Sequence, residues 1–484
     1  MLKRIPAAEA RAVASLSILF LSLALVGCAA KGRPARPSPL TVPPLSFTPP
    51  EPERVTLACG AALYLLPDHT LPLFSLYAVA RAGSAYDPPG KEGLAALTAS
   101  VMRTGGTRHV SPDELDLQLE FMAADISTGT NEDASSLSLS CLSKDTERAL
   151  GLLCDILLNP AFNDEKITLR KGQVREAIRR RNDEPGQIVS REFDRLVYGS
   201  YPYGHQVIGE PGAMDRITRE DLTAFHRDYI RPSGMIIGVA GDFDRDTVVR
   251  ELNGALGSAH APLQPSLPPA PDRAERSVNY IEKDTEQAHL MVGHPGIRRD
   301  NPDYFPLMVM NEILGAGAFS SRMLERIRVN EGLAYHVATQ FTTNVQTGLF
   351  YAVCQTKEKS ATEALSFILD ELERIRTERV TREELARAKD SFINSFVFHF
   401  TTAPQVVAQR VDLEFFGLPP DYLKTYLARV SAVTDDDVLR VAQTYLHPEK
   451  ATILVLGTKG EFEPPLEKFG PVNALKLTDV GSEK

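Results

Sequence analysis

The residues that could do chemistry in this chain are few and scattered. It has ten histidines, but the zinc-binding pattern His-x-x-Glu-His occurs nowhere in it. His289 and His294 are five residues apart in an expected strand and turn, a spacing that does not suit two ligands of one metal. Ser320 and Ser321 lack a histidine and aspartate pattern that would make a nucleophile, and no Gly-Lys-Ser/Thr follows Gly315-Ala316-Gly317-Ala318 to make a phosphate loop. The sequence therefore predicts no self-contained catalytic site.

Four cysteines follow the first fifty residues, and none of them belongs to a CxxC pair. Because Cys59, Cys141, Cys154 and Cys354 are isolated, a zinc knuckle is not expected. Cys141 and Cys354 lie in runs that alternate apolar and polar residues, so we expect buried free thiols. An exported protein could also form a disulfide, but the sequence assigns no pair.

Arg328 and Tyr335 lie seven residues apart in the second half of the chain. An arginine presents a rigid fork of donors that is always charged, and a tyrosine hydroxyl can donate to a developing oxyanion. Because Gly332 lies between them, we expect Arg328 at a helix end and Tyr335 on the next strand. From the residues alone, packing explains the pair better, as a surface arginine and a core tyrosine.

Two segments of the chain repeat the same order of helix and strand signals. Ile217 to Gly241 and Val433 to Gly457 carry the same signals in the same order, and Tyr445 follows Tyr229 by 216 residues. In each segment a threonine with an acidic residue three positions later predicts a capped helix. A tyrosine and a proline end that helix, and a β-rich run then ends at glycine.

A second pair of signals supports the duplication. Asn163-Asp164-Glu165 and Thr381-Arg382-Glu383 each predict the start of a long charged helix. We therefore expect two homologous domains, 52–265 and 275–470. The Pro-rich stretch from Ala261 to Pro271 is the expected linker.

Inside each half, strand signals and helix signals are mixed. Ser135 to Ser143 and Gly348 to Val353 alternate apolar and small or polar residues, as half-buried strands do. Ser111, followed by Pro112 and by Glu114 three positions on, is typical of a helix start. Strands and helices do not follow a strict βαβ alternation. The pattern favours α+β domains, each with an antiparallel-rich sheet covered by helices on one face.

The first fifty residues differ from the rest. Lys3 and Arg4 precede an apolar run from about Ala12 to Gly27, the pattern of a secretory signal. The run is short for a membrane-spanning helix, and Pro-rich chain follows it at once. We expect export, with a single anchor helix as the alternative.

The end of the apolar run is more specific. Leu25-Val26-Gly27-Cys28 resembles the cleavage box of bacterial lipoproteins. This resemblance implies a signal peptide at 1–28 and lipidation of Cys28. Ala29 at the next position favours the periplasmic side of the outer membrane, and the Pro-rich residues 29–51 predict an extended tether.

Composition limits the function classes. Of 484 residues, 43% are hydrophobic and 24% are charged, which leaves ample apolar chain for a core. The net charge of −10 argues against a general nucleic-acid binder.

Several motifs follow one another in a specific order. Gly83-Ser84-Ala85-Tyr86-Asp87-Pro88 is followed by Gly93-Leu94-Ala95, Tyr201-Pro202-Tyr203-Gly204, Ser320-Ser321-Arg322-Met323-Leu324 and Gly332-Leu333-Ala334-Tyr335. Together they resemble the insulinase/pitrilysin family of zinc peptidases, the inverzincins, which includes processing peptidases and the core subunits of respiratory complex III. The resemblance spans nearly all of the mature chain. It implies two processing-peptidase-like (LuxS/metallohydrolase-like) domains.

In active members of this family, His-x-x-Glu-His follows Gly-Leu-Ala. The two histidines lie on one helical face and bind zinc, and the glutamate activates the metal-bound water. Here the ligand and base positions are Ala96, Ala99 and Ser100, and the third ligand position is Ala177, next to Glu176. The resemblance therefore implies a degenerate metal site, with no metal or other cofactor in this chain and no catalytic residue of its own.

The same resemblance gives Arg328 and Tyr335 a role. Family members use an arginine and a tyrosine at this spacing to bind substrate and to stabilise the oxyanion. Some bacterial relatives are heterodimers in which one chain brings zinc and the other brings this pair. We therefore expect a zinc-less subunit that contributes to peptide hydrolysis only with a zinc-bearing partner. The alternative is a non-enzymatic pseudopeptidase lipoprotein, acting as a scaffold or a peptide-binding module.

Overall fold

The computed structural model describes residues 47–257, 267–271, 275–317 and 320–477. The predicted signal peptide, Cys28, most of the tether 29–51 and most of the linker from Ala261 to Pro271 lie outside the described residues. Within that described part, none of the helices is both long enough and apolar enough to cross a membrane.

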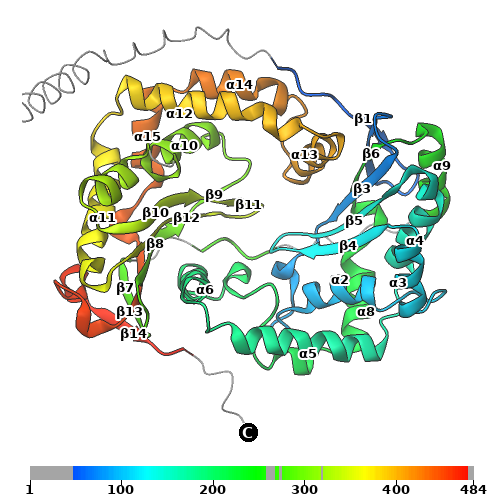
Figure 1. The fold of residues 1–484 in the computed structure, drawn as a ribbon, viewed down its shortest axis with the longest axis horizontal. Coiled ribbons are helices and arrows are strands. Elements are labelled where there is room, and N and C mark those ends of the chain that lie inside the picture. Colours follow the sequence, from blue (N-terminus) through cyan, green and yellow to red (C-terminus); the bar gives the residue numbers. More distant parts are fainter. Residues whose placement is uncertain (1–46, 258–266, 272–274, 318–319, 478–484) are drawn as a thin grey trace, which may run out of the picture. The chain divides into compact units, whose positions relative to one another are not determined.

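The described chain is built around two six-stranded mixed sheets, one in each half of the sequence (Figure 1). The first has the order β1-β2-β6-β3-β5-β4 and the second has the order β10-β12-β8-β13-β7-β14. The strands of the first sheet are β1 (Glu53–Thr56), β2 (Ala62–Pro67), β3 (Leu73–Ala80), β4 (Asp125–Thr130), β5 (Ser135–Leu142) and β6 (Ile236–Gly241). Those of the second are β7 (Ser277–Glu282), β8 (Ala288–Pro295), β10 (Ala334–Phe341), β12 (Leu349–Thr356), β13 (Thr452–Gly457) and β14 (Val472–Leu475), and β9 (Ile297–Arg298) pairs separately with β11 (Thr343–Asn344).

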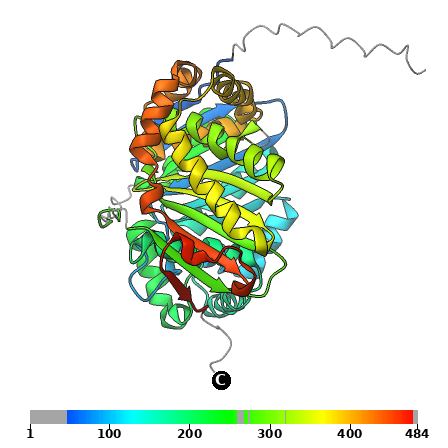
Figure 2. The same cartoon turned by 90° about the vertical axis from the view of Figure 1, so that its left-hand side faces the viewer.

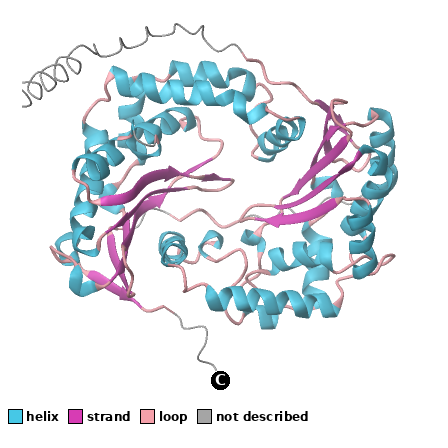
Figure 3. Ribbon diagram, in the orientation of Figure 1, coloured by secondary structure: helices cyan, strands magenta, loops and turns pink. Residues whose placement is uncertain are grey.

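Helices flank each sheet (Figures 1 and 3). Those of the first half are α2 (Leu94–Thr104), α3 (Pro112–Phe121), α4 (Thr146–Leu158), α5 (Asp164–Arg180), α6 (Pro185–Tyr198), α7 (Ala213–Arg216), α8 (Arg219–Tyr229) and α9 (Arg245–Leu256). Those of the second half are α10 (Tyr304–Asn311), α11 (Ala361–Thr377), α12 (Arg382–Ser395), α13 (Ala403–Phe415), α14 (Tyr422–Ala432) and α15 (Asp435–Tyr445), some of which lie in front of the second sheet in Figure 2. Two π-helical segments, Glu312–Ala316 and Leu324–Asn330, add to the second half.

The predicted repeat is confirmed in the backbone. Capping boxes at Thr218 and Thr434 start α8 and α15. Each of these helices leads into a strand, β6 or β13, that pairs in parallel with an early strand of the same half, β2 for β6 and β7 for β13. The helix starts expected at Ser111, Asn163 and Thr381 are also present, each with a side-chain cap.

The alternation of side chains along the strands gives the first sheet two apolar faces. On one face Leu63, Leu65, Phe74 and Leu76 join the core that contains residues of α2, α4 and α8. On the other face a smaller cluster forms, which includes Tyr64, Tyr77, Val79, Ala240, Val407, Val411 and Phe415. Three of its members come from α13, a helix of the second half, which packs against β2, β3 and β6.

The second sheet mirrors this arrangement. Its own helices cover one face, and α6, a helix of the first half, packs against β8 and β13 on the other. Ile188, Val189 and Phe193 of α6 cluster there with Met291 and Leu454. The α+β class with helix-covered sheets is confirmed, and the structure adds that each half covers the second face of the other half's sheet.

The predicted limits 52–265 and 275–470 stay predictions. β14 extends to Leu475, beyond the second of these ranges. The four cysteines of the described chain are buried and free, as expected. Burial raises the pKa of both Cys154 and Cys354 to about 12, so these thiols stay protonated.

Candidate functional site

The positions predicted to form a degenerate metal site lie on two helices that pack together, α2 and α5. A buried carboxylate fixes the start of α2, because Asp87 accepts hydrogen bonds from the backbone N–H of Gly93 and of Ala95, both at 2.7 Å. Gly93, with φ of +98°, supplies the left-handed turn just before the helix. The predicted positions Ala96, Ala99 and Ser100 are therefore carried on a well-formed helix.

The side chains at these positions do not fit zinc. Ala96 and Ser100 are half-buried, Ala99 is buried and Ala177 is exposed. Methyl groups offer no donor atom, and a single neutral hydroxyl does not replace imidazole and carboxylate ligands. The neighbouring Glu176 is paired with Arg179 and Arg180 on the surface of α5. Within the described residues, no group of three or more His, Cys, Asp or Glu side chains is placed to hold a metal.

Arg328 and Tyr335 are brought together in the second half. Arg328 lies in the π-helical segment Leu324–Asn330 and Tyr335 lies on β10, which follows after Gly332 with φ of +65°. The guanidinium carbon is 5.5 Å from the centroid of the tyrosine ring, a cation–π distance. The expected helix end and following strand are confirmed.

Exposure decides between two interpretations of Tyr335. The side chain is 71% exposed, so the interpretation as a core tyrosine kept by packing is wrong. β10 is an edge strand, and its pairing with β12 shifts register between Ala334 and His336. Such an irregularity re-aims a side chain. The ring and its hydroxyl are thus available to a ligand beside the sheet.

Two ion pairs, each with at least one buried partner, hold the segment that carries Arg328. Arg322 donates to Glu384 through Nε at 2.6 Å and through Nη2 at 2.9 Å. Burial opposes ionisation, but the hydrogen bonds from Arg322 lower the pKa of Glu384 to about 2. Arg326 donates to Oε1 of the fully buried Glu371 at 2.8 Å. Sequence analysis missed both pairs, because their partners are 45 or more residues apart.

Gly315 of the glycine run and His294 of the histidine pair make structural contacts. A Cβ on Gly315 would lie 2.5 Å from Oγ1 of Thr339 on β10, so glycine is required there for close packing. His294 is buried, with Nδ1 at 2.8 Å from the carbonyl oxygen of Pro295, and Nε2 accepts from the backbone N–H of His447 at 3.1 Å. Each ring nitrogen of His294 therefore lies at hydrogen-bond distance from a backbone group.

Two family models match consecutive parts of the chain. The one described as Insulinase (Peptidase family M16) matches residues 74–210, and the one described as Peptidase M16 inactive domain matches residues 216–392. The chain belongs to peptidase family M16. The M16 assignment agrees with the two-sheet architecture and with the order of the sequence motifs.

Relatives of this M16 chain carry two kinds of name. An uncharacterized zinc protease of Streptomyces coelicolor is 26% identical over 348 residues, which cover 70% of this chain and 76% of the relative. A non-peptidase homolog of Helicobacter pylori is 22% identical over 393 residues, which cover 81% of this chain and 90% of the relative.

Solved structures share the fold. A peptidase M16 inactive domain from Pseudomonas fluorescens superposes with a TM-score of 0.78 at 26% identity and covers 84% of this chain and 98% of its own. A chain of complex III from Candida albicans reaches a TM-score of 0.70 at 15% identity, covering 84% of this chain and 96% of its own, and shows the fold alone.

Proposed function

We propose that this M16 chain is the zinc-less subunit of a two-chain metallopeptidase and supplies Arg328 and Tyr335 to a partner that binds zinc. One observation carries the proposal: the arginine and the tyrosine lie together, with the ring 71% exposed at a sheet edge, while the metal positions have lost their ligands. An exposed tyrosine gains nothing from core packing, so a role in binding explains its position better.

In this mechanism, the chain would bind the peptide and polarise the carbonyl group that is attacked. The Tyr335 hydroxyl would donate to the carbonyl oxygen that becomes the oxyanion, and the Arg328 guanidinium would hold a main-chain carbonyl of the same peptide. The cation–π contact fixes the two groups relative to each other. The partner's zinc would supply the activated water.

The location is part of the proposal. The signals at residues 1–28 support export and lipidation at Cys28, with residues 29–51 as a tether. The folded chain would then act on the periplasmic side of the outer membrane, where short peptides are available as substrates. Replacing Cys28 by serine should release the chain from the membrane fraction.

Co-expression with a zinc-motif M16 relative, ideally from a neighbouring gene, tests whether peptide hydrolysis needs both chains. We expect peptide hydrolysis only when both chains are present. Tyr335→Phe should lower kcat by about 100-fold or more, since loss of one oxyanion donor has that effect, and Arg328→Ala should lower kcat/KM at least as much. Arg179→Ala, an equal loss of charge on the surface of α5, is the matched control.

The same experiment also tests the alternative, that the chain is a non-enzymatic pseudopeptidase. If the two chains associate but Arg328→Ala and Tyr335→Phe leave hydrolysis unchanged, the pair has no catalytic role. The chain would then be a scaffold or a peptide-binding pseudopeptidase. The Helicobacter pylori relative is named a non-peptidase homolog.

A further inference from the structure

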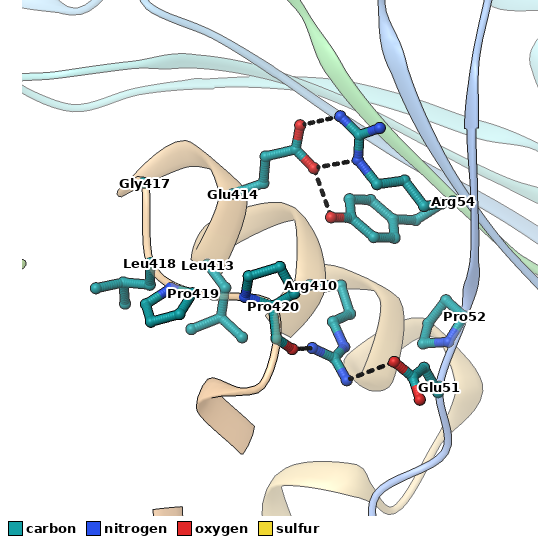
Figure 4. Close-up of a pocket in the computed structure, with 11 residues that line it drawn as sticks. Glu51, Pro52, Arg54, Arg410, Leu413, Glu414, Gly417, Leu418, Pro419 and Pro420 are labelled. Carbon is teal, nitrogen blue, oxygen red and sulfur yellow. Dashed lines mark hydrogen bonds and ion pairs between the residues drawn. The ribbon is translucent and has the colours of Figure 1, made fainter. Parts of the chain in front are cut away.

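A pocket of about 510 Å³ lies where α13 meets the segment that leads into β1 (Figure 4). Its volume is in the range of ligand-binding pockets. Its lining residues come from both ends of the described chain: Glu51, Pro52, Arg54, Tyr64, Arg410, Leu413, Glu414, Gly417, Leu418, Pro419 and Pro420. None of them belongs to the Arg328 and Tyr335 pair, so the pocket is a second candidate site.

One of the two carboxylates in this pocket is fully engaged. Glu414 accepts from Arg54 through Nε at 2.9 Å and Nη2 at 2.7 Å, and it also accepts from the Tyr64 hydroxyl (Figure 4). The hydrogen bonds from Arg54, the largest effect, hold the pKa of Glu414 below its ordinary value. Arg54 and Glu414 therefore neutralise each other, and neither is left to compensate another charge.

Among the described residues, the positive charge of Arg410 has no carboxylate partner at hydrogen-bond distance. It is only 6% exposed, and one of its donors, Nη1, bonds to the carbonyl oxygen of Pro420 at 2.7 Å. Its Nε is buried without a hydrogen-bond partner in the described chain. Its ion-pair contact, from Nη2 to Glu51, is 3.9 Å long and is not a hydrogen bond.

The carboxylate of Glu51 is paired with another residue, Lys424. Its side chain is 56% exposed and lies 2.6 Å from Nζ of Lys424, whose hydrogen bond lowers the pKa of Glu51. A guanidinium has five N–H donors, and Arg410 uses one of them in a good hydrogen bond. Burying a charge with so few partners is costly. Arg410 therefore keeps unused N–H donors at the pocket wall, to which a further anion could bind.

We infer that this pocket binds the C-terminal carboxylate of a peptide whose last residues are apolar. The fork of Arg410 matches a carboxylate, and the apolar walls of Leu413, Leu418 and Pro419 suit an apolar last side chain. A carboxylate brings one negative charge, which Arg410 can balance. A phosphate would bring a second charge close to Glu51 and Glu414.

Calorimetric titration of the mature chain with acetyl-Pro-Leu, as free acid and as C-terminal amide, tests the inference. We expect the acid to bind at least tenfold more tightly than the amide, because a hydrogen bond to a charged group is worth about a factor of ten or more. Arg410→Gln should remove this preference, and Arg410→Lys, which keeps the charge but loses the fork, should weaken acid binding. Arg245→Gln, outside the pocket, should bind the acid as the wild type does.

Three outcomes would overturn the inference: equal affinity for acid and amide, no binding of the acid at about 10 mM, well beyond a millimolar Kd, or an unchanged preference in Arg410→Gln. Inorganic phosphate that binds as tightly as the acid would also overturn it, in favour of a general anion site. If Arg410→Gln fails to fold, the acid–amide contrast in the wild type and the Arg410→Lys variant still decide. The titration requires no zinc-bearing partner and no hydrolysis, so a failure of this inference is distinguishable from a failure of the proposed function.

Discussion

At the scale of single residues, the positions that the family resemblance assigns to the zinc site and its base hold Ala96, Ala99, Ser100 and Ala177, none of which offers an imidazole or a carboxylate. The backbone at the degenerate site is helical and properly started, with Asp87 bonded to the N-terminus of α2. Positions 96 and 100 are one helical turn apart and both half-buried, as two ligands of one metal require. What is missing is donor atoms, and not the elements that would position them.

This leads to a prediction about metal binding. The triple variant Ala96→His, Ser100→His, Ala177→Glu should retain about one zinc ion per chain after dialysis, because three ligands suffice for a catalytic-type site. Metal analysis of the dialysed protein measures this. The wild type and the variant with the two histidines alone serve as controls and should retain much less. A triple variant no better than the wild type would show that α2 and α5 do not hold these positions at ligand distance.

At the scale of elements, the packing of α13 against the first sheet depends on a residue without a side chain beneath the helix. Gly238 in β6 lies under α13. A Cβ there would be 2.2 Å from Cγ1 of Val407 and 2.9 Å from Cγ2 of Val411. The helix can approach the sheet closely only because this residue has no side chain.

We therefore expect Gly238→Ala to destabilise the protein by about 1–3 kcal/mol through overpacking. Chemical denaturation measures the free energy of unfolding. Val407→Ala in the same chain should restore part of the loss, because it makes room for the new methyl group. Gly151→Ala in α4, where nothing lies within 4 Å of the added Cβ, should be neutral or stabilising. Equal effects at both glycines would contradict the packing argument.

At the scale of the whole folded chain, a titratable group lies where α6 covers the second sheet. Asp194 of α6 lines a pocket of about 210 Å³ together with Glu132 from the first half and Met291 and Tyr351 from the second. Burial, and to a smaller extent the charge of Glu132, raise the pKa of Asp194 from 3.8 to about 7. The packing of the two halves therefore includes a carboxyl group that stays protonated near neutral pH.

This predicts a pH dependence of stability. Between about pH 4 and pH 7 the folded chain keeps the Asp194 proton while the unfolded chain loses it, so stability falls as pH rises through this window. Asp194→Asn should remove the fall. Its free energy of unfolding relative to wild type should rise by about 1–3 kcal/mol from pH 4 to pH 8, whereas the exposed Asp183→Asn should show no such trend. A difference in free energy of unfolding between Asp194→Asn and the wild type that does not change with pH would contradict the prediction.

The sequence by itself determined what depends on neighbours along the chain. The caps at Thr218 and Thr434, the alternation in β5 and β12 and the repeat they belong to are short-range features, and each is present as predicted. The predicted absence of metal ligands at Ala96, Ser100 and Ala177, and of a base at Ala99, is likewise a matter of residue type. The spacing of Arg328 and Tyr335 was visible, but not whether the ring is buried.

The tertiary structure alone decided what depends on residues far apart. The exposure of Tyr335, the helices that cross between the halves and the buried pair of Arg322 with Glu384 result from long-range packing. The uncompensated Arg410 is a further case, since its surroundings combine residues 51–64 with residues 410–420. No local pattern encodes these contacts, because burial and charge pairing are set by which surfaces meet once the chain has folded.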